Sequence, residues 1–265
     1  MTATRNIEIF KDTLNQIEYR YPIDMGNVKY YNGVKMLPTL DSVDGDSEIV
    51  MVRGGTVSTG YANADKMRTS ILNFADALEA GGLVWVGANT QEENICRCSN
   101  LYPMLDNKKS RVNYYTPNAK MVELSGREVY TDRIIYARDV IVFKDDKTYL
   151  NIKPRKLDVI TCPAPNTPLK ELSAMKIYAT RMEQIILSAI DNGVECLVLG
   201  AWGCGAFGQT PELVANSFAQ VLNVYRGYFK KVVFAIRPTY SETDGMYEIF
   251  DKVLTNNFGE VKHEK

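Results

Sequence analysis

The stretch Glu195-Cys-Leu-Val-Leu-Gly-Ala-Trp-Gly-Cys-Gly-Ala-Phe-Gly-Gln-Thr-Pro211 decides the fold class, because it joins an apolar run, a glycine-rich loop and a helix start. The continuous apolar run 195–199 is typical of a central strand that is covered on both faces. Thr210 suits the N-cap of a helix, and Pro211 suits its first position. A strand, a loop and a helix in this order predict an α/β domain, in which ligands bind beyond the carboxyl ends of the strands.

The flanking sequence repeats this alternation of strand and helix. Short apolar runs predict further strands at 48–53, 68–75, 138–144, 156–162 and 230–237. Apolar residues at helical spacing predict helices at 4–17, 172–192 and 211–228. Such a chain forms a layered α/β domain with a largely parallel core. We expect three parts, namely an N-terminal accessory segment that is irregular after its helix, a core domain and a flexible polar tail, at 1–47, 48–255 and 256–265.

Charge and hydropathy exclude several classes of protein. The 265 residues contain 31 Lys and Arg against 32 Asp and Glu, so the net charge of -1 gives no global electrostatic case for binding nucleic acid or a membrane. The sequence has no apolar stretch long enough to span a membrane, and its start lacks the apolar core of a signal peptide. We therefore expect a cytoplasmic protein.

The residue inventory restricts the catalytic chemistry. The chain has one histidine, His263, close to its C-terminus, which argues against triads, Cys-His pairs and histidine-bearing zinc sites. Five cysteines contain no CxxC pair, so no zinc site is expected, and Cys162 and Cys196 are expected to be buried apolar groups. A catalyst built from this chain must move protons with Asp, Glu, Cys, Lys or Tyr.

A second glycine-containing stretch, 81–93, places two adjacent carboxylates, Glu92 and Glu93, behind Gly81-Gly82. Such a loop suits a phosphate-bearing ligand that meets an acid/base group. However, Thr90-Gln-Glu-Glu93 also matches a capping box, in which Thr90 and Glu93 exchange hydrogen bonds at the start of a helix. Spacing alone favours the cap. Adjacent residues on a helix point in different directions, so at most one of the two carboxylates faces a scissile bond.

The stretch Gly203-Cys-Gly-Ala-Phe-Gly208 matches the dinucleotide-binding pattern G-x-G-x-x-G. The pattern precedes the last predicted strand, so too little chain remains to build a Rossmann fold after it. The expected acidic residue at the end of the next strand is also absent, because that run ends at Arg237. No P-loop motif occurs in the chain. A nucleotide cofactor is therefore not predicted.

Several motifs resemble those of one known family. Asn73-Phe-Ala, Gly81-Gly82 and Gln91-Glu92-Glu93 are similar to the signature of the bacterial-type poly(ADP-ribose) glycohydrolases, in which three glycines and a spacer precede Gln-Glu-Glu. Four other stretches are similar to that family in the same order, so the resemblance covers roughly residues 48–250; they lie at 130–136, 140–145, 159–166 and 198–208. The resemblance implies a macrodomain, with three α/β/α layers, a mixed, largely parallel central sheet and an N-terminal helical extension.

The resemblance also implies a substrate and roles for individual residues. Glu93 would protonate the departing 2′-oxygen and then activate water, while Glu92 would bind ribose hydroxyls and Gln91 would support the loop. Phe207 would pack against the terminal ribose. The other implied ligand-binding residues are Asn73, Asp76, Gly81, Gly82, Gly203, Cys204, Gly205 and Ala206. The implied partner is ADP-ribose or an ADP-ribosylated protein or nucleic acid, and no metal, cofactor or membrane is implied.

Two positions depart from the family pattern. Leu83 stands where the family has its third glycine, and Asp76 stands where it usually has an asparagine. A leucine that must adopt positive φ would cost roughly 1 kcal/mol or more, and a carboxylate near a diphosphate is unfavourable. Three hypotheses therefore stay open: an ADP-ribosyl hydrolase, an ADP-ribose-binding module with little turnover, and another nucleotide-processing activity in the same pocket.

Overall fold

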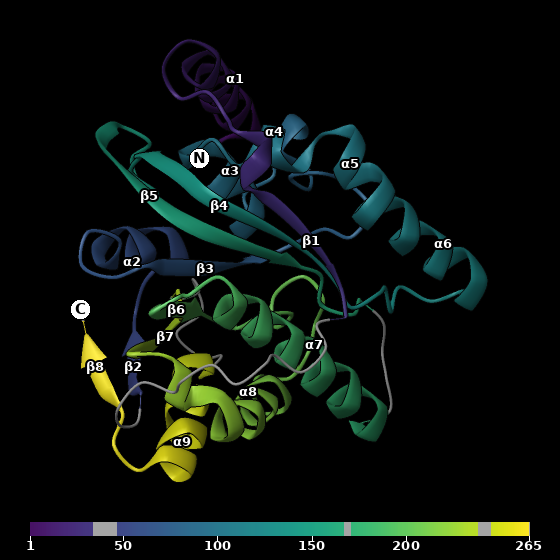
Figure 1. Ribbon diagram of the computed structural model, residues 1–265, viewed down its shortest axis with the longest axis vertical. Helices are drawn as coiled ribbons and strands as arrows, with labels where there is room; N and C mark the ends of the chain where they lie inside the picture. Colours follow the sequence, from purple (N-terminus) through teal and green to yellow (C-terminus); the bar gives the residue numbers. More distant parts are fainter. Residues whose placement is uncertain (34–46, 167–170, 238–244, 265) are drawn as a thin grey trace.

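One mixed sheet forms the centre of the molecule in the computed structural model, which describes residues 1–33, 47–166, 171–237 and 245–264 (Figure 1). Its eight strands lie in the order β1-β4-β5-β3-β6-β7-β2-β8. The strands from β5 to β8 in this order run parallel, whereas β4 is antiparallel to both of its neighbours. The strand bounds are Val28–Asn32, Glu48–Val52, Thr69–Phe74, Arg133–Lys144, Asn151–Cys162, Cys196–Leu199, Lys231–Ala235 and Lys262–Glu264 for β1 to β8.

Helices cover both faces of this sheet (Figure 1). The side chains of β6 alternate between the faces, because Leu197 and Leu199 pack in one hydrophobic cluster and Cys196 and Val198 in the other. One cluster includes α7 Glu171–Asp191, α8 Pro211–Tyr225 and α9 Met246–Phe258. The opposite cluster includes α1 Ala3–Arg20, α2 Thr56–Asn63, α3 Gln91–Cys98 and α4 Tyr102–Leu105. The expected three-layer α/β/α macrodomain-like architecture with an N-terminal helix is confirmed. The shorter elements are α5 Lys108–Ser110, α6 Thr116–Ser125 and the single turns Met25–Asn27, Val84–Val86, Arg111–Tyr115 and Arg226–Tyr228.

The predicted strands and long helices are present, but the structure adds order at both ends of the chain. Residues 18–45 were expected to be irregular, yet β1 pairs with β4 within this range; residues 34–46 lie outside the described part. Near the C-terminus, where a flexible tail was expected, α9 extends to Phe258 and β8 pairs with β2. Both added strands lie at sheet edges and face solvent over much of their length, and neither carries an apolar run that the sequence would reveal. The division into 1–47, 48–255 and 256–265 stays a prediction.

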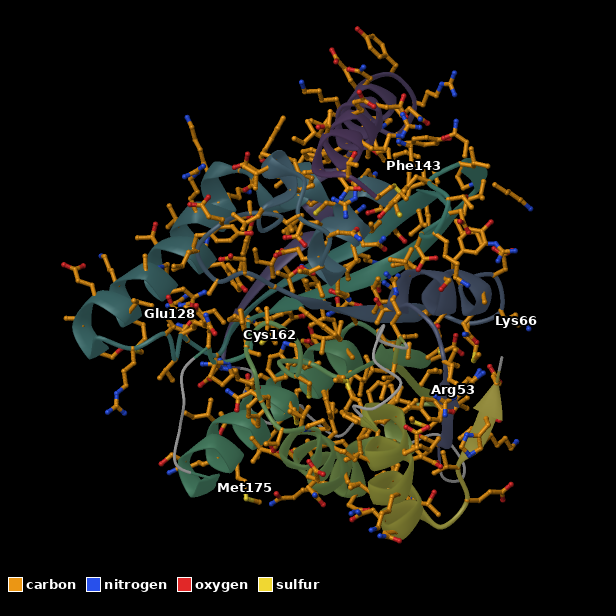
Figure 2. All side chains as sticks on the ribbon, turned by 180° about the vertical axis from the view of Figure 1, so that it is seen from behind. Arg53, Lys66, Glu128, Phe143, Cys162 and Met175 are labelled. Atoms are coloured by element: carbon orange, nitrogen blue, oxygen red, sulfur yellow. The ribbon has the colours of Figure 1, made fainter. Side chains whose placement is uncertain are left out.

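The N-terminal helix α1 packs on the core beside the glycine-containing loop. The Phe10 side chain is fully buried, and its ring centroid lies 4.9 Å from that of Trp85 and 5.0 Å from that of Tyr102. The Asn6 side-chain amide donates to the Gly87 carbonyl at 2.9 Å. At the other end of α1, Tyr21 stacks on Phe143, which is labelled in Figure 2. The helix therefore supports the loop from outside. None of the described helices is long and apolar enough to cross a membrane.

If α1 belongs to the same cooperative unit as the core, Phe10→Ala lowers the free energy of unfolding by about 3 to 5 kcal/mol, since it leaves a cavity under Trp85 and Tyr102. Tyr19→Ala on the same helix is the control, because the Tyr19 side chain is 79% exposed and its loss changes stability by about 0.5 kcal/mol or less. Denaturant unfolding of both variants measures the difference. Equal stability of the two variants would show that α1 unfolds separately.

Candidate active site

A cavity of about 570 Å³ lies where β3, β6, β7 and β2 end. This is the position that the parallel strands predict, because their carboxyl ends meet at one edge of the sheet. Nine of the predicted site residues line the cavity: Asp76, Gly82, Gln91, Glu92, Glu93, Gly203, Gly205, Ala206 and Phe207. The structure thus brings the two glycine-containing stretches together, although more than 100 residues separate Glu93 from Gly203 in the chain.

The remaining three predicted residues lie behind the cavity wall. Asn73 is fully buried, and its side-chain amide donates to Glu92 Oε1 at 3.0 Å and to Thr161 Oγ1 at 3.3 Å. Gly81 faces Tyr102, since a Cβ added to it would lie 2.8 Å from that ring. Cys204 packs on the hydrophobic core, and burial raises the pKa of its thiol to about 12. A thiol with such a pKa is not a nucleophile near neutral pH.

The glycine loop makes room for the Glu93 carboxylate. Gly81 and Gly82 have φ values of 70° and 58°, in the left-handed region that favours glycine. A Cβ added to Gly82 would lie 2.6 Å from Glu93 Oε1 and 3.2 Å from Glu92 Oε2. Gly82 therefore lies against both carboxylates, and no other residue fits there without a shift of the loop or of Glu93.

Glu93 is held by three hydrogen-bond donors. The Leu83 backbone N–H donates to Oε1 at 3.0 Å, and the Thr90 backbone N–H donates to Oε2 at 2.9 Å. The Thr90 hydroxyl also donates to Oε2. The predicted capping box is therefore present, and its acidic member is also a cavity-lining carboxylate. The structural and the functional interpretations of this motif apply to the same residue.

Glu92 is held by two different donors and lies deeper. Its Oε1 accepts from the Asn73 side chain, and its Oε2 accepts from the Asp76 backbone N–H at 2.7 Å. The residue is only 2% exposed. Desolvation by burial raises the pKa of Glu92 well above its usual value, against the opposing effect of these two hydrogen bonds. The neighbouring Glu92 and Glu93 carboxyls thus have different surroundings.

Gln91 joins the start of α3 to the end of β3. Its side-chain oxygen accepts from the Phe74 backbone N–H at 2.8 Å. Its amide donates to the Leu72 carbonyl at 2.7 Å and to the Thr56 hydroxyl at 2.8 Å. These bonds fix the first turn of α3, which carries both carboxylates, to the central sheet and to the start of α2.

The two departures from the family pattern have local explanations. Leu83 has φ -95° and ψ 34°, so the backbone at this position does not require glycine. Its side chain is 56% exposed and lines the cavity. Asp76 Oδ1 accepts from the backbone N–H groups of Leu78 and Glu79, at 2.7 and 3.0 Å, which makes it a turn residue of the loop.

The second glycine loop follows β6. Gly203 has φ 85°, and a Cβ added to it would clash with the Tyr178 hydroxyl. Phe207 is half-buried, packs against the hydrophobic core and lines the cavity. Trp202 is fully buried beneath the loop, and its indole N–H donates to the Cys162 carbonyl at 3.1 Å. Glycine backbone thus faces the cavity from this side, above a fixed aromatic base.

Some residues that line the cavity were not expected from the sequence. Gly54, Gly55 and Thr56 follow β2, and Arg237 follows β7. The same strand-end argument that located Gly203 would have found them, because they too follow predicted parallel strands. The other unpredicted lining residues are Phe74, Leu83, Asn89, Thr90, Asn94, Ala164, Ala201, Trp202, Ala235, Ile236 and Met246. Among the described residues, no group of three or more His, Cys, Asp and Glu side chains could hold a metal ion.

Comparisons with known proteins agree with this geometry. The family described as "Microbial-type PARG, catalytic domain" matches residues 14–145. A mutant poly(ADP-ribose) glycohydrolase from Deinococcus radiodurans, solved with ADP-ribose, is 30% identical over 80% of this chain and 86% of that chain, with a TM-score of 0.71. The chain belongs to the microbial-type poly(ADP-ribose) glycohydrolase family.

Other members of the family match over nearly the whole chain. The poly(ADP-ribose) glycohydrolase from Thermomonospora curvata is 26% identical, with a TM-score of 0.81, over 94% of this chain and 99% of that chain. The same enzyme bound to the inhibitor ADP-HPD is 25% identical over the same shares, with a TM-score of 0.78. None of the curated proteins matches the chain. The resemblance of the sequence motifs to this family is therefore confirmed.

The backbone angles of Leu83 show no strain that a glycine at this position would remove. We expect Leu83→Gly to be less stable than Leu83→Ala by about 0.5 to 1 kcal/mol, because glycine adds only freedom to the unfolded chain. Denaturant unfolding of the two variants measures this difference. A glycine variant more stable than the alanine variant would show that the position is strained.

The raised pKa of Glu92 predicts a pH-dependent stability. The folded protein binds this proton more tightly than the unfolded chain, so the contribution is complete below the unfolded pKa of about 4.5 and is lost as the pH rises through the raised pKa. Within this window the free energy of unfolding falls by up to about 1.4 kcal/mol per pH unit. Glu92→Gln lacks the proton, so its stability relative to wild type increases with pH in denaturant unfolding from pH 4.5 to 8.

Glu79→Gln is the matched control for this measurement. Glu79 lies in the same loop, is exposed and does not line the cavity, so its variant follows the pH dependence of the wild type. Parallel curves for wild type and Glu92→Gln would contradict the proposed proton binding. Glutamine fits the site, because the Asn73 side-chain oxygen has no hydrogen-bond partner among the described residues and can accept from the new amide.

Proposed function

We propose that this protein hydrolyses the ribose-ribose O-glycosidic bond of poly(ADP-ribose) and releases ADP-ribose. The observation that carries this proposal is the pair Glu92 and Glu93, fixed against Gly82 at one end of a cavity in a chain of the poly(ADP-ribose) glycohydrolase family. Related enzymes have been solved with ADP-ribose and with the inhibitor ADP-HPD. The cavity of about 570 Å³ has the size of a small-molecule site.

Glu93 is proposed as the acid/base group. It gives its proton to the departing 2′-oxygen while the ribose develops oxocarbenium character, and the resulting carboxylate takes a proton from the attacking water. The Leu83 and Thr90 N–H groups and the Thr90 hydroxyl donate to the two Glu93 oxygens and hold the side chain at the cavity wall. The donors are fixed by the loop and by the start of α3, so they need no rearrangement during the reaction.

Glu92 is proposed to bind the hydroxyls of the ribose at the scissile bond. Because burial favours its neutral form, Glu92 can both donate and accept a hydrogen bond. A neutral Glu92 also places less negative charge beside the substrate diphosphate. The glycine loop at 203–207, four of whose residues line the cavity, is proposed to bind that diphosphate through backbone N–H groups. Gly82 also lines the cavity, but its own N–H donates to the Glu79 carbonyl at 3.1 Å.

The alternative is an ADP-ribose-binding protein with little turnover. Two observations favour it: the Leu83 side chain lines the cavity next to Glu93, and Asp76 uses one carboxylate oxygen for the loop instead of for a ligand. The molecule to which the polymer is attached is proposed to be a protein or a nucleic acid. A cytoplasmic location also stays a proposal, supported by five free cysteines, which suit a reducing compartment.

The proposed mechanism predicts the effect of removing the Glu93 proton. Glu93→Gln lowers the rate of ADP-ribose release from poly(ADP-ribose) by about 100-fold to 10,000-fold, the range of a lost general acid/base. Calorimetry with ADP-ribose measures binding by the same variant, which we expect to persist, because glutamine still accepts a hydrogen bond from the Thr90 N–H. Release is followed as free ADP-ribose over time.

Glu79→Gln again provides the control, with release equal to that of the wild type, since Glu79 is exposed and does not line the cavity. Binding of ADP-ribose without release by the wild type would identify the alternative, a binding protein. Equal release by wild type and Glu93→Gln would exclude Glu93 as the acid. Absence of both binding and release by the wild type would overturn both proposals.

A further inference from the structure

Arg237 is the only cationic side chain among the described residues that line the cavity. Three carboxylate residues, Asp76, Glu92 and Glu93, line the same cavity. Arg237 is the second residue after β7, and its side chain is 53% exposed. Neither the proposed acid/base chemistry nor the proposed binding of the diphosphate uses the Arg237 side chain. Its presence in the cavity therefore needs a separate explanation.

Arg237 is held in place by a buried carboxylate. Its Nη2 lies 3.3 Å from Asp146 Oδ2, and the Asp146 side chain is only 1% exposed. A buried carboxylate requires a partner, because a charge without one is costly in the interior. The Asn94 side-chain amide donates to the Asp146 carbonyl at 3.0 Å, which ties this pair to α3. The position of the guanidinium is therefore set by the fold.

Gly55 permits this arrangement. A Cβ added to Gly55 would clash with Asp146 Oδ2 and would lie 2.7 Å from Arg237 Nη2. The φ of Gly55 is -85°, an ordinary value, so glycine is required here by the close approach of these two side chains and not by backbone angles. Gly54, Gly55 and Thr56 line the cavity beside Arg237.

Arg237 and the acid pair lie at different strands of the sheet. Glu92 and Glu93 belong to α3, which is tied to the end of β3, whereas Arg237 follows β7 and Gly55 follows β2. The order β3-β6-β7-β2 places two strand spacings, roughly 10 Å, between β3 and β7. If the terminal ribose lies at Glu93 and the diphosphate at the β6 loop, the base of the nucleotide extends toward Arg237.

We propose that the Arg237 guanidinium stacks on the purine ring of the ADP-ribose unit and that Asp146 positions it for this contact, a proposal that rests on the proposed function. The contact with Asp146 offsets part of the guanidinium charge, which leaves less attraction for the diphosphate, whereas half of the Arg237 side chain stays exposed and its planar group suits stacking on a base. Met246 and Ile236 line the cavity beside Arg237 and give this end an apolar wall that suits a base.

The first test replaces the planar guanidinium of Arg237 by an ammonium of the same charge. Arg237→Lys weakens ADP-ribose binding by about 5- to 30-fold in calorimetry, because an ammonium is compact and strongly hydrated and has no planar face to lie on the base. With poly(ADP-ribose) the KM rises by a similar factor and kcat stays unchanged, since the base contact is equal in the ground and transition states. Arg53→Lys is the matched control: Arg53 is 52% exposed, pairs with Glu248 and does not line the cavity, so both constants stay unchanged (Figure 2).

The second test removes the charge of the positioning carboxylate. Asp146→Asn frees the guanidinium, so ADP-ribose binding weakens if Arg237 stacks on the base, and thermal unfolding verifies that the variant is folded. Tighter binding by Asp146→Asn would show that Arg237 attracts the diphosphate instead, and wild-type affinity in Arg237→Lys would also overturn stacking. Both results contradict stacking only, and the proposed hydrolase activity still holds if the wild type releases ADP-ribose. A wild type that neither binds nor releases ADP-ribose would overturn the proposed function.

Discussion

The bonding of the Glu93 carboxylate is the constraint on which the site depends. One oxygen accepts from the Leu83 N–H and the other from the Thr90 N–H, so a single side chain joins the glycine loop to the first turn of α3. A helix cap satisfies backbone donors that would otherwise be unpaired. In this protein the cap also fixes a carboxylate at the cavity wall. Removing it would disturb the helix start and the chemistry together, so stability and proposed catalysis share one set of hydrogen bonds.

The sheet converts this local arrangement into a binding site. Parallel strands β3, β6, β7 and β2 all end at one edge, and a separate loop follows each of them. Apolar side chains on both faces fix the strands between two helical layers, so the loops have rigid bases. Gln91 extends this rigidity to α3, because it bonds to the backbone of β3 at two points. Residues that are far apart in the chain therefore meet at this edge of the sheet.

Local patterns in the sequence predict the central strands and the helices α1, α7 and α8, whereas nine of the lining residues follow from the resemblance to the family. Apolar runs mark β3 and β7, and glycine pairs mark the close approach at Gly82. The half-exposed strand β1 and the pairing of Arg237 with Asp146 lack such a pattern. Both depend on contacts between distant segments, and only the fold determines these. Gly55 is a similar case. Its φ is ordinary, and a glycine is needed there because the Asp146 side chain, more than 90 residues away in the chain, leaves no room for a Cβ.

The charges of the cavity have a further consequence for binding. A dianionic diphosphate must enter a site that is lined by Asp76, Glu92 and Glu93, with Arg237 as the only cation among the described lining residues. Two features reduce the repulsion. Burial favours the neutral form of Glu92, and Asp76 directs one oxygen to the N–H groups of its own loop. An approaching diphosphate favours the neutral Glu92 carboxyl further, since like charges raise the pKa of an acid. Binding of the diphosphate therefore reinforces the neutral form of Glu92 that burial already favours, and the negative charge beside the substrate stays low.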